Sequence, residues 1–258
     1  MSTPRPPAPK PAPVIVVGCH KGGIGRTAVA VNLAAMLALS GRQTLLVDLD
    51  AKGDATASVG LPRAERGKSL ARFSEPWSFL KDTLNVARPG GLDVWPGGPA
   101  LDVLTHELTG SDNWRHLVSG LEQARLRYRA IVIDAPSDLG PLAKNAFAAG
   151  DALLLPVSSS AHAEEAVGAT VRAAREFQKS YEVFGVTIES RAANDDREEE
   201  PSEPPSGVLL LDCAICFDAE TFLHATQAGL PVFEAAPESR AARSFLELGR
   251  EVLARIVP

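Results

Sequence analysis

A glycine-rich loop carrying two cations has the composition of a phosphate-binding site. It comprises Cys19-His20-Lys21-Gly22-Gly23-Ile24-Gly25-Arg26-Thr27. The β-branched run before it, residues 14–17, predicts a buried strand. The alanine- and leucine-rich run after it, residues 28–37, predicts a helix. Glycines between a strand and a helix let backbone N–H groups converge on the helix N-terminus, and this geometry cradles phosphate.

The loop follows the phosphate-loop pattern with one departure. Thr27 stands where a hydroxyl holds Mg²⁺, whereas the preceding position, normally lysine, is Arg26. A second cation, Lys21, begins the loop. The alternative is a glycine-rich turn with no ligand. The residues expected to contact a nucleotide are Lys21, Gly22, Gly23, Ile24, Gly25, Arg26, Thr27 and Ala28.

Carboxylates follow two further apolar runs. Residues 43–50 predict a strand that ends in Asp48 and Asp50, which the period of two places on one side. Ligands of parallel sheets bind at the carboxyl ends of strands, so both side chains can face the phosphates or a metal. The alternative role is capping of the next turn. Residues 128–134 predict a strand ending in Asp134, typical of a Walker B element in which the aspartate holds Mg²⁺.

The loop with its early lysine resembles the deviant Walker A box of the ParA/MinD family of ATPases. Residues 48–56 resemble that family's Asp-x-Asp-Pro-Gln-Gly-Asn-Ala-Thr box, with Ala51-Lys52 replacing Pro-Gln and Asp54 replacing Asn. Residues 137–146 resemble the family's switch and its helix, and residues 151–157 resemble the strand that follows. The segment from Gly229 onward resembles the C-terminal segment of ParA proteins.

This resemblance implies a doubly wound, mostly parallel sheet flanked by helices, and a slow, partner-stimulated ATPase that uses ATP and Mg²⁺. It implies that Asp50 orients the attacking water and that Asp48 acts near the metal beside Thr27 and Asp134. Lys21 would reach the nucleotide of a second subunit in a homodimer formed on ATP binding. Hydrolysis would reset a cycle that positions or segregates a plasmid, a chromosome region or a protein complex, with a ParB-like or other adaptor as partner.

Two other functions stay open. Because arginine is longer and forked, Arg26 could support nucleotide binding with weak or absent hydrolysis, as in a scaffold or adaptor of the same family. Cys213-Ala214-Ile215-Cys216 could mark an iron–sulfur carrier ATPase of the same fold. However, residues three apart in a strand face opposite ways, which favours two buried structural cysteines. The sequence does not locate the residues that would contact adenine.

The composition places these motifs in an ordinary intracellular domain. The 258 residues suffice for one large α/β domain, predicted at 14–258, after a disordered proline-rich tail at 1–13. A disordered acidic insert is predicted at 190–206. Three cysteines without regular spacing, no signal peptide and no apolar run of about 20 residues predict a cytoplasmic location, with nucleoid association left open.

The predicted C-terminal helix is the candidate surface for non-specific DNA binding. It carries four arginines, but Glu247 and Glu251 can pair with Arg243 and Arg255 at i, i+4. The net charge of -6 also opposes a basic footprint over the whole chain. DNA binding is therefore expected from the resemblance rather than from the residues. Membrane binding through a lysine-rich amphipathic tail is not expected, since none follows this helix.

Overall fold

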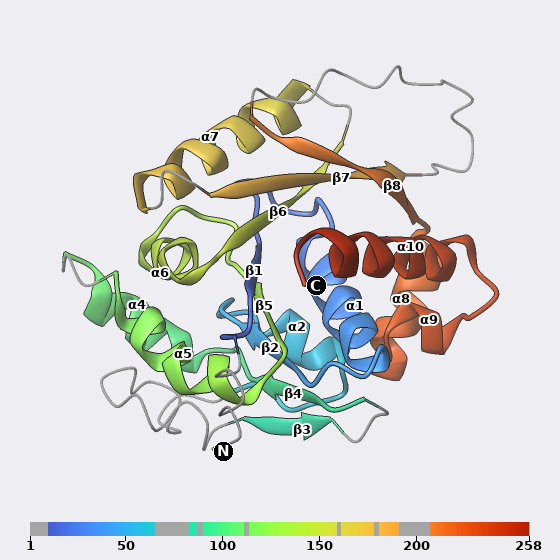
Figure 1. Cartoon of the computed structure of the whole chain (residues 1–258), viewed down its shortest axis with the longest axis horizontal. Coiled ribbons are helices and arrows are strands. Elements are labelled where there is room, and N and C mark those ends of the chain that lie inside the picture. The colour runs from blue at the N-terminus through green and yellow to red at the C-terminus, as the bar shows by residue number, and fades with distance from the viewer. Residues whose placement is uncertain are drawn as a thin grey trace, which may run out of the picture.

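The computed structural model describes residues 10–64, 83–86, 90–110, 114–158, 161–177, 181–190 and 207–257, built around one eight-stranded sheet (Figure 1). The strand order is β3-β4-β2-β5-β1-β6-β7-β8. Every neighbouring pair is parallel except β3 with β4. The strands span Val14–Val17 (β1), Thr44–Asp48 (β2), Leu84–Val86 (β3), Leu92–Trp95 (β4), Ala130–Asp134 (β5), Ala152–Val157 (β6), Glu182–Ser190 (β7) and Leu209–Phe217 (β8).

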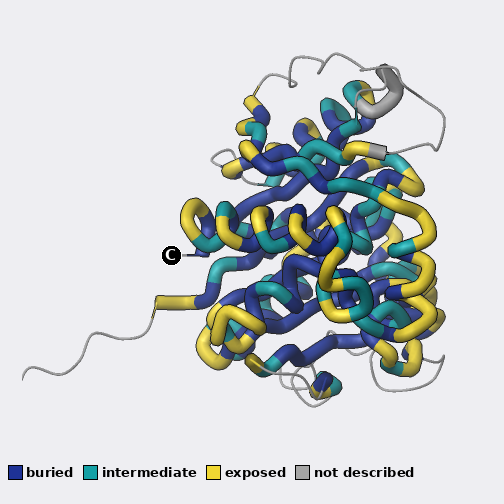
Figure 2. The backbone as a smooth tube through the Cα atoms, turned by 90° about the vertical axis from the view of Figure 1, so that its right-hand side faces the viewer, coloured by how far each residue is buried: buried dark blue, intermediate teal, exposed yellow. Residues whose placement is uncertain are grey.

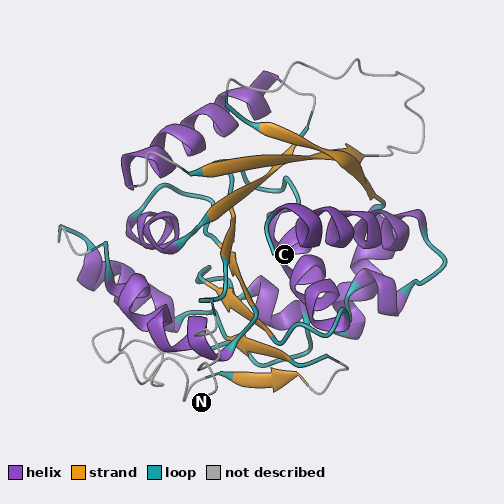
Figure 3. Cartoon of the chain, viewed as in Figure 1, coloured by secondary structure: helices purple, strands orange, loops and turns teal. Residues whose placement is uncertain are grey.

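Helices cover both faces of this sheet, as Figure 3 shows. One face packs against α4, α5, α6 and α7, and the other against α1, α8, α9 and α10. The helices span Arg26–Leu39 (α1), Asp54–Ser58 (α2), Ala100–Leu108 (α4), His116–Arg127 (α5), Pro141–Ala149 (α6), Ala161–Phe177 (α7), Ala219–Ala228 (α8), Val232–Ala235 (α9) and Arg240–Arg255 (α10). The predicted doubly wound, mostly parallel sheet is confirmed.

The central strands are apolar because they are covered on both faces. All residues of β1, β2, β5 and β6 are buried, and Figure 2 shows this buried centre between helices whose outer sides are exposed. Such strands are the near-continuous apolar runs typical of parallel sheets. Leu33 of α1 and Phe245 of α10 fill one core layer, and Leu121 and Phe147 fill the other.

The register of the central strands determines where the functional side chains meet. β5 lies between β1 and β2, with Val17 opposite Asp134 and Asp48 opposite Asp134. The carboxyl ends of β1, β2 and β5 therefore meet at one edge of the sheet. Each of these strands is followed by a candidate segment, and binding sites in doubly wound sheets form at this edge.

Several elements differ from the sequence expectations. The edge strand β3, the short α2 and the helix α8 were not predicted from periodicity. Strand β2 ends at Asp48, so the alternation that would place Asp50 on the same side does not extend to it. The tail at 1–13 is described only from residue 10, and most of the acidic insert at 190–206 lies outside the described residues. None of the described helices has the length and apolarity that a membrane span requires.

Candidate functional site

The loop between β1 and α1 has the shape of an open cradle. Gly23 has φ +72° and Gly25 has φ +90°, a left-handed conformation that glycine adopts without steric cost. A Cβ atom added at Gly22, Gly23 or Gly25 would meet no heavy atom within 4 Å. The space over the loop is therefore free for a ligand. Because α1 begins at Arg26, its unpaired N–H groups and the positive end of its dipole face this space.

Thr27 and Asp134 form a corner that suits a divalent cation. The Thr27 hydroxyl donates to Asp134 Oδ2 at 2.9 Å. Asp134 is buried, and its Oδ1 has no hydrogen-bond partner within the described part of the chain. Burial, followed by the nearby charge of Asp48, raises the pKa of Asp134 well above the usual range of a carboxyl. An unpartnered carboxylate oxygen beside a hydroxyl is the donor set that Mg²⁺ prefers.

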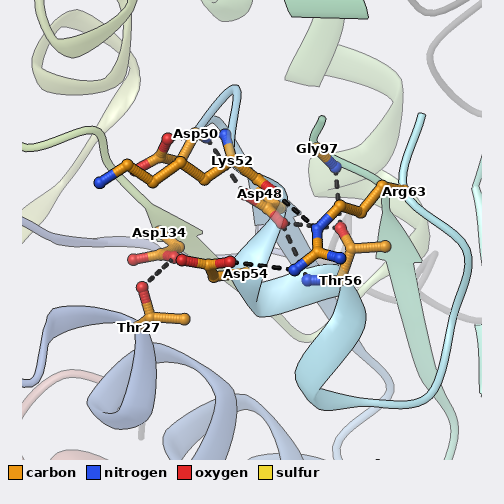
Figure 4. Close-up of polar contacts among 9 residues, drawn as sticks. All are labelled: Thr27, Asp48, Asp50, Lys52, Asp54, Thr56, Arg63, Gly97 and Asp134. Carbon is orange, nitrogen blue, oxygen red and sulfur yellow. Dashed lines mark hydrogen bonds and ion pairs between the residues drawn. The ribbon is translucent and has the colours of Figure 1, made fainter. Parts of the chain in front are cut away.

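Asp48 organises the loop that follows β2. Its Oδ2 accepts from the Thr56 amide at 2.8 Å and from the Thr56 hydroxyl at 2.7 Å, while Oδ1 accepts from the Asp50 amide at 3.1 Å. The Gly97 amide donates to the Thr56 hydroxyl oxygen at 2.8 Å (Figure 4). Burial raises the pKa of Asp48 to about 6. Three donors already use both of its oxygens, which is the pattern of a carboxylate that positions a loop.

Asp50 lies in the turn that this network holds. Its Oδ1 accepts from the Lys52 amide at 2.9 Å, and the carboxylate is half-buried. Arg63 reinforces the turn, because its Nε donates to the Lys52 carbonyl at 2.6 Å and a terminal nitrogen donates to Asp54 Oδ1 at 3.1 Å. Figure 4 shows Thr27 and Asp134 on one side of this turn and Arg63 on the other. Asp50 is therefore held near the metal corner without being a part of it.

Arg26, the first residue of α1, is directed toward the segment after β5. It is 8% exposed, and its guanidinium donates to the Ala135 carbonyl at 2.7 Å. A guanidinium has five N–H donors, and this bond uses one of them. Lys21 is half-buried at the start of the loop, and Ile24 is buried in the core below it. The sequence-predicted loop residues are thus brought together, with Ile24 anchoring the loop through its side chain.

A cavity of about 460 Å³ opens beside Thr27 and Ala28. Its other walls come from α2, from the end of β8 and from α8, and they include Phe217 and Phe222. Its size is that of a small-molecule site. Sequence reasoning missed this cavity because α2 and α8 were not predicted.

Four functional-site residues found in the structure were not singled out from the sequence: His20, Thr56, Gly97 and Thr170. The His20 amide donates to the Thr170 hydroxyl oxygen at 2.8 Å, and His20 Nδ1 lies 3.0 Å from the Ser137 carbonyl oxygen. A signal was available for His20, which lies inside the loop motif, and for Thr56, which ends the family box at residues 48–56. Gly97 and Thr170 become neighbours of the site through the fold.

The two remaining sequence candidates lie elsewhere. Cys213 is buried on the side of β8 that faces α10, as predicted. Cys216 is only half-buried, so the prediction that it is a buried cysteine is wrong. No group of three metal-ligating side chains occurs among the described residues. On α10, Arg255 pairs with Glu251 at 3.5 Å as predicted, but Arg243 donates to the Glu238 carbonyl instead of pairing with Glu247.

Comparison with known proteins agrees with this site. A family model described as an AAA domain (AAA_31) matches residues 12–184. The chromosome-partitioning ATPase Soj of Thermus thermophilus is 31% identical over 252 residues, which cover 94% of this chain and 96% of Soj. The Soj sequence therefore matches the chain beyond the nucleotide-binding motifs.

Two solved structures share the fold. The ATP complex of Cyanothece McdA(D38A) has a TM-score of 0.75 at 17% identity and covers 95% of this chain and 98% of its own. The Mg-ADP complex of MinD from Pyrococcus horikoshii has a TM-score of 0.75 at 21% identity and covers 96% and 99%. Taken with the family match and the Soj relative, the chain belongs to the ParA/MinD family of P-loop ATPases, within it to the ParA-type partition ATPases.

Proposed function

We propose that this protein binds ATP with Mg²⁺, dimerises on ATP binding and hydrolyses ATP slowly in a cycle that positions or segregates a cargo. The observation that carries the proposal is the open glycine cradle joined to the Thr27–Asp134 corner, where Asp134 Oδ1 is buried without a partner. An open glycine loop next to a hydroxyl and an unpartnered carboxylate oxygen can bind a phosphate together with a metal ion, whereas a turn without a ligand would need neither feature. The name of the Soj relative, a chromosome-partitioning ATPase, supports the choice of cargo class.

The nucleotide is held by the loop and the cavity beside it. Backbone amides of residues 22–27 bind the phosphates, aided by the positive end of α1 and by the four remaining donors of Arg26. The cavity next to Ala28 takes the nucleoside, and Phe217 and Phe222 supply apolar contacts to it. Its position directly beside Thr27 supports this placement.

Thr27 and Asp134 would hold Mg²⁺, which would supply positive charge against that of the phosphates. Asp134 stays ionised once the cation offsets the cost of its burial. The role of Asp48 as a further metal ligand stays a prediction, and its three hydrogen bonds favour the positioning of the loop that carries Asp50. Asp50 then orients the attacking water.

Lys21 contributes from the partner subunit in the ATP-bound dimer. A cation supplied in trans stabilises the charge that builds up during phosphoryl transfer. Its place at the mouth of the loop, half-buried, supports a role at a subunit interface. A ParB-like or other adaptor would stimulate turnover, and DNA would be bound through arginines of α10.

A catalytically weak scaffold is the second candidate, and Arg26 is the observation that favours it. Its guanidinium is committed to the Ala135 carbonyl at 2.7 Å, and a buried arginine has less freedom to follow the transferring phosphate than a lysine ammonium. An iron–sulfur carrier finds no support, since Cys213 and Cys216 lie on opposite faces of β8.

The deciding experiment compares wild type with Arg26→Lys, Lys21→Ala and Asp50→Ala, measuring ATP affinity, turnover and dimerisation by light scattering. We expect wild type to bind ATP, dimerise and turn over slowly, and Asp50→Ala to bind ATP but remain dimeric. Lys21→Ala is expected to lose dimerisation. If wild type binds no ATP whereas Arg26→Lys does, the ATPase proposal fails and the scaffold function stands.

A further inference from the structure

His20 joins three elements of the site through two hydrogen bonds. Its backbone N–H donates to the Thr170 hydroxyl of α7 at 2.8 Å, and its ring Nδ1 lies 3.0 Å from the Ser137 carbonyl oxygen. The Thr170 hydroxyl is fully buried and donates in turn to the Ala166 carbonyl at 2.7 Å. The phosphate loop, α7 and the segment after β5 are therefore tied at one residue.

The segment after Asp134, residues 135–137, is bonded repeatedly to the phosphate loop. Thr27 donates to Asp134 at 2.9 Å, Arg26 donates to the Ala135 carbonyl at 2.7 Å, and His20 reaches the Ser137 carbonyl at 3.0 Å. Thr27 and Arg26 are themselves proposed ligands of Mg²⁺ and phosphate, whereas the His20 side chain is not. Substitution of His20 therefore breaks one bond between the phosphate loop and residues 135–137 without removing a ligand of ATP or Mg²⁺.

The acceptor determines the protonation state of the imidazole. A carbonyl oxygen has no hydrogen to donate, so Nδ1 of His20 must carry the proton in this contact. In the neutral ring Nε2 is then left unprotonated. The contact therefore specifies one tautomer, and a tautomer can be observed directly.

We propose that His20 is a positioning residue that holds residues 135–137 against the phosphate loop, so that phosphate binding in the loop is transmitted to the segment following the metal carboxylate. The positioning itself follows from the geometry, whereas its effect on turnover rests on the proposed ATPase function. Because the His20 ring contacts Ser137 and is not among the proposed ligands of ATP or Mg²⁺, its loss should affect turnover more than nucleotide affinity. A contact that only stabilised the fold would not separate the two.

Side-chain length provides matched variants. Asparagine places an amide nitrogen at the δ position, where it can replace Nδ1–H of histidine. Glutamine places the nitrogen one atom further out, and leucine offers no donor. We therefore expect His20→Asn to keep the contact with Ser137 and both His20→Gln and His20→Leu to lose it. His106→Gln, on an exposed position of α4, is the control for a histidine change outside the site.

The first measurement is the ¹⁵N spectrum of histidine-labelled full-length protein at pH 8.5 without nucleotide, with the His20 signals assigned by their loss in His20→Asn. We expect His20 to be protonated at Nδ1. Signals showing protonation at Nε2 would overturn the proposal. This arm does not depend on ATPase activity, so its outcome is separate from that of the proposed function.

The second measurement is ATP turnover of the same variants. We expect kcat to fall about ten-fold in His20→Leu and His20→Gln, the factor that corresponds to one ordinary hydrogen bond, with KM unchanged within about two-fold. His20→Asn should restore kcat to within about three-fold of wild type. Equal kcat in wild type and His20→Leu would overturn the proposal. If wild type has no turnover, the ATPase proposal fails, and the tautomer alone decides the position of His20.

Discussion

Substitution of Gly97 by alanine should disable the site from a position far from its motifs in the sequence. A Cβ atom on Gly97 would lie 2.4 Å from Asp48 Cγ and Oδ1 and 2.8 Å from Oδ2. Its φ is outside the left-handed region, so the change adds no backbone strain. The carboxylate cannot move away freely, because Asp48 is fully buried and bonded to Thr56 and Asp50. The added methyl group must therefore displace the carboxylate or the strand end.

The expected cost has two parts. Forcing a methyl group into a packed interior costs about 1–3 kcal/mol. Weakening a buried hydrogen bond to a charged group adds about 1.5–3 kcal/mol, and Asp48 accepts three such bonds. If one of the three is lost, the free energy of unfolding of Gly97→Ala should fall by about 2.5–6 kcal/mol. Because the same bonds hold the turn of Asp50, turnover should fall about 10–100-fold with a smaller change in nucleotide affinity.

Urea unfolding followed by circular dichroism gives the stability, and binding of a fluorescent ATP analogue with steady-state turnover gives the functional effect. The matched control is Gly168→Ala in α7, where the nearest atom is a flexible Arg172 nitrogen at 3.3 Å. That change should stabilise the protein by about 0.5–1 kcal/mol through helix propensity. A Gly97→Ala protein within 1 kcal/mol of wild type, with unchanged turnover, would refute the packing account of Asp48.

Three further predictions address other parts of the molecule. Asp134→Asn should weaken Mg²⁺-dependent nucleotide binding about 10–100-fold while leaving metal-free binding close to wild type, as a Mg²⁺ titration would measure. Glu251→Gln should lower the free energy of unfolding by about 1–3 kcal/mol, since the Glu251 carboxylate accepts from the Asp212 and Cys213 amides at 3.0 and 2.6 Å; the exposed Glu247→Gln is the control. Burial raises the pKa of Cys213 to about 12 from an ordinary 9.0, so alkylation at pH 8 should be about 1,000-fold slower than for free cysteine. Because the unfolded thiol ionises first, this residue's contribution to stability should fall as pH rises from 9 to 12.

Most of the fold and the ligand-facing chemistry could be predicted because both are local in the sequence. Residues 14–27 carry a strand, a glycine turn and a helix start in one continuous run, and the apolar run before Asp134 carries the metal carboxylate. Parallel topology then brings these separate runs to one edge of the sheet. The Thr27–Asp134 contact at 2.9 Å is the result of that convergence.

The supporting contacts could not be predicted because they depend on how distant segments approach one another. The Gly97 amide reaches Thr56 across 41 positions and Thr170 reaches His20 across 150, and in each pair one partner, Gly97 or Thr170, lies outside every motif. The hydrogen-bond partners of Asp48 could not be predicted either. Strand periodicity predicted which side of the sheet its side chain faces, but β2 ends at Asp48. The groups that donate to its carboxylate belong to α2 and to the turn before it.

Arg26, which departs from the family pattern, and His20 of the same loop both contact the segment after Asp134. Arg26 replaces the usual lysine, and its guanidinium binds the Ala135 carbonyl at 2.7 Å; His20, from the same loop, binds Ser137 two residues further on. A lysine at position 26 could not act as a planar fork toward a carbonyl and a phosphate at the same time. If Arg26 bridges both, phosphate binding pulls directly on the backbone next to the metal carboxylate. Arg26→Lys should then retain ATP binding but weaken the effect of His20→Leu on kcat, because two ties that act on one segment are not independent.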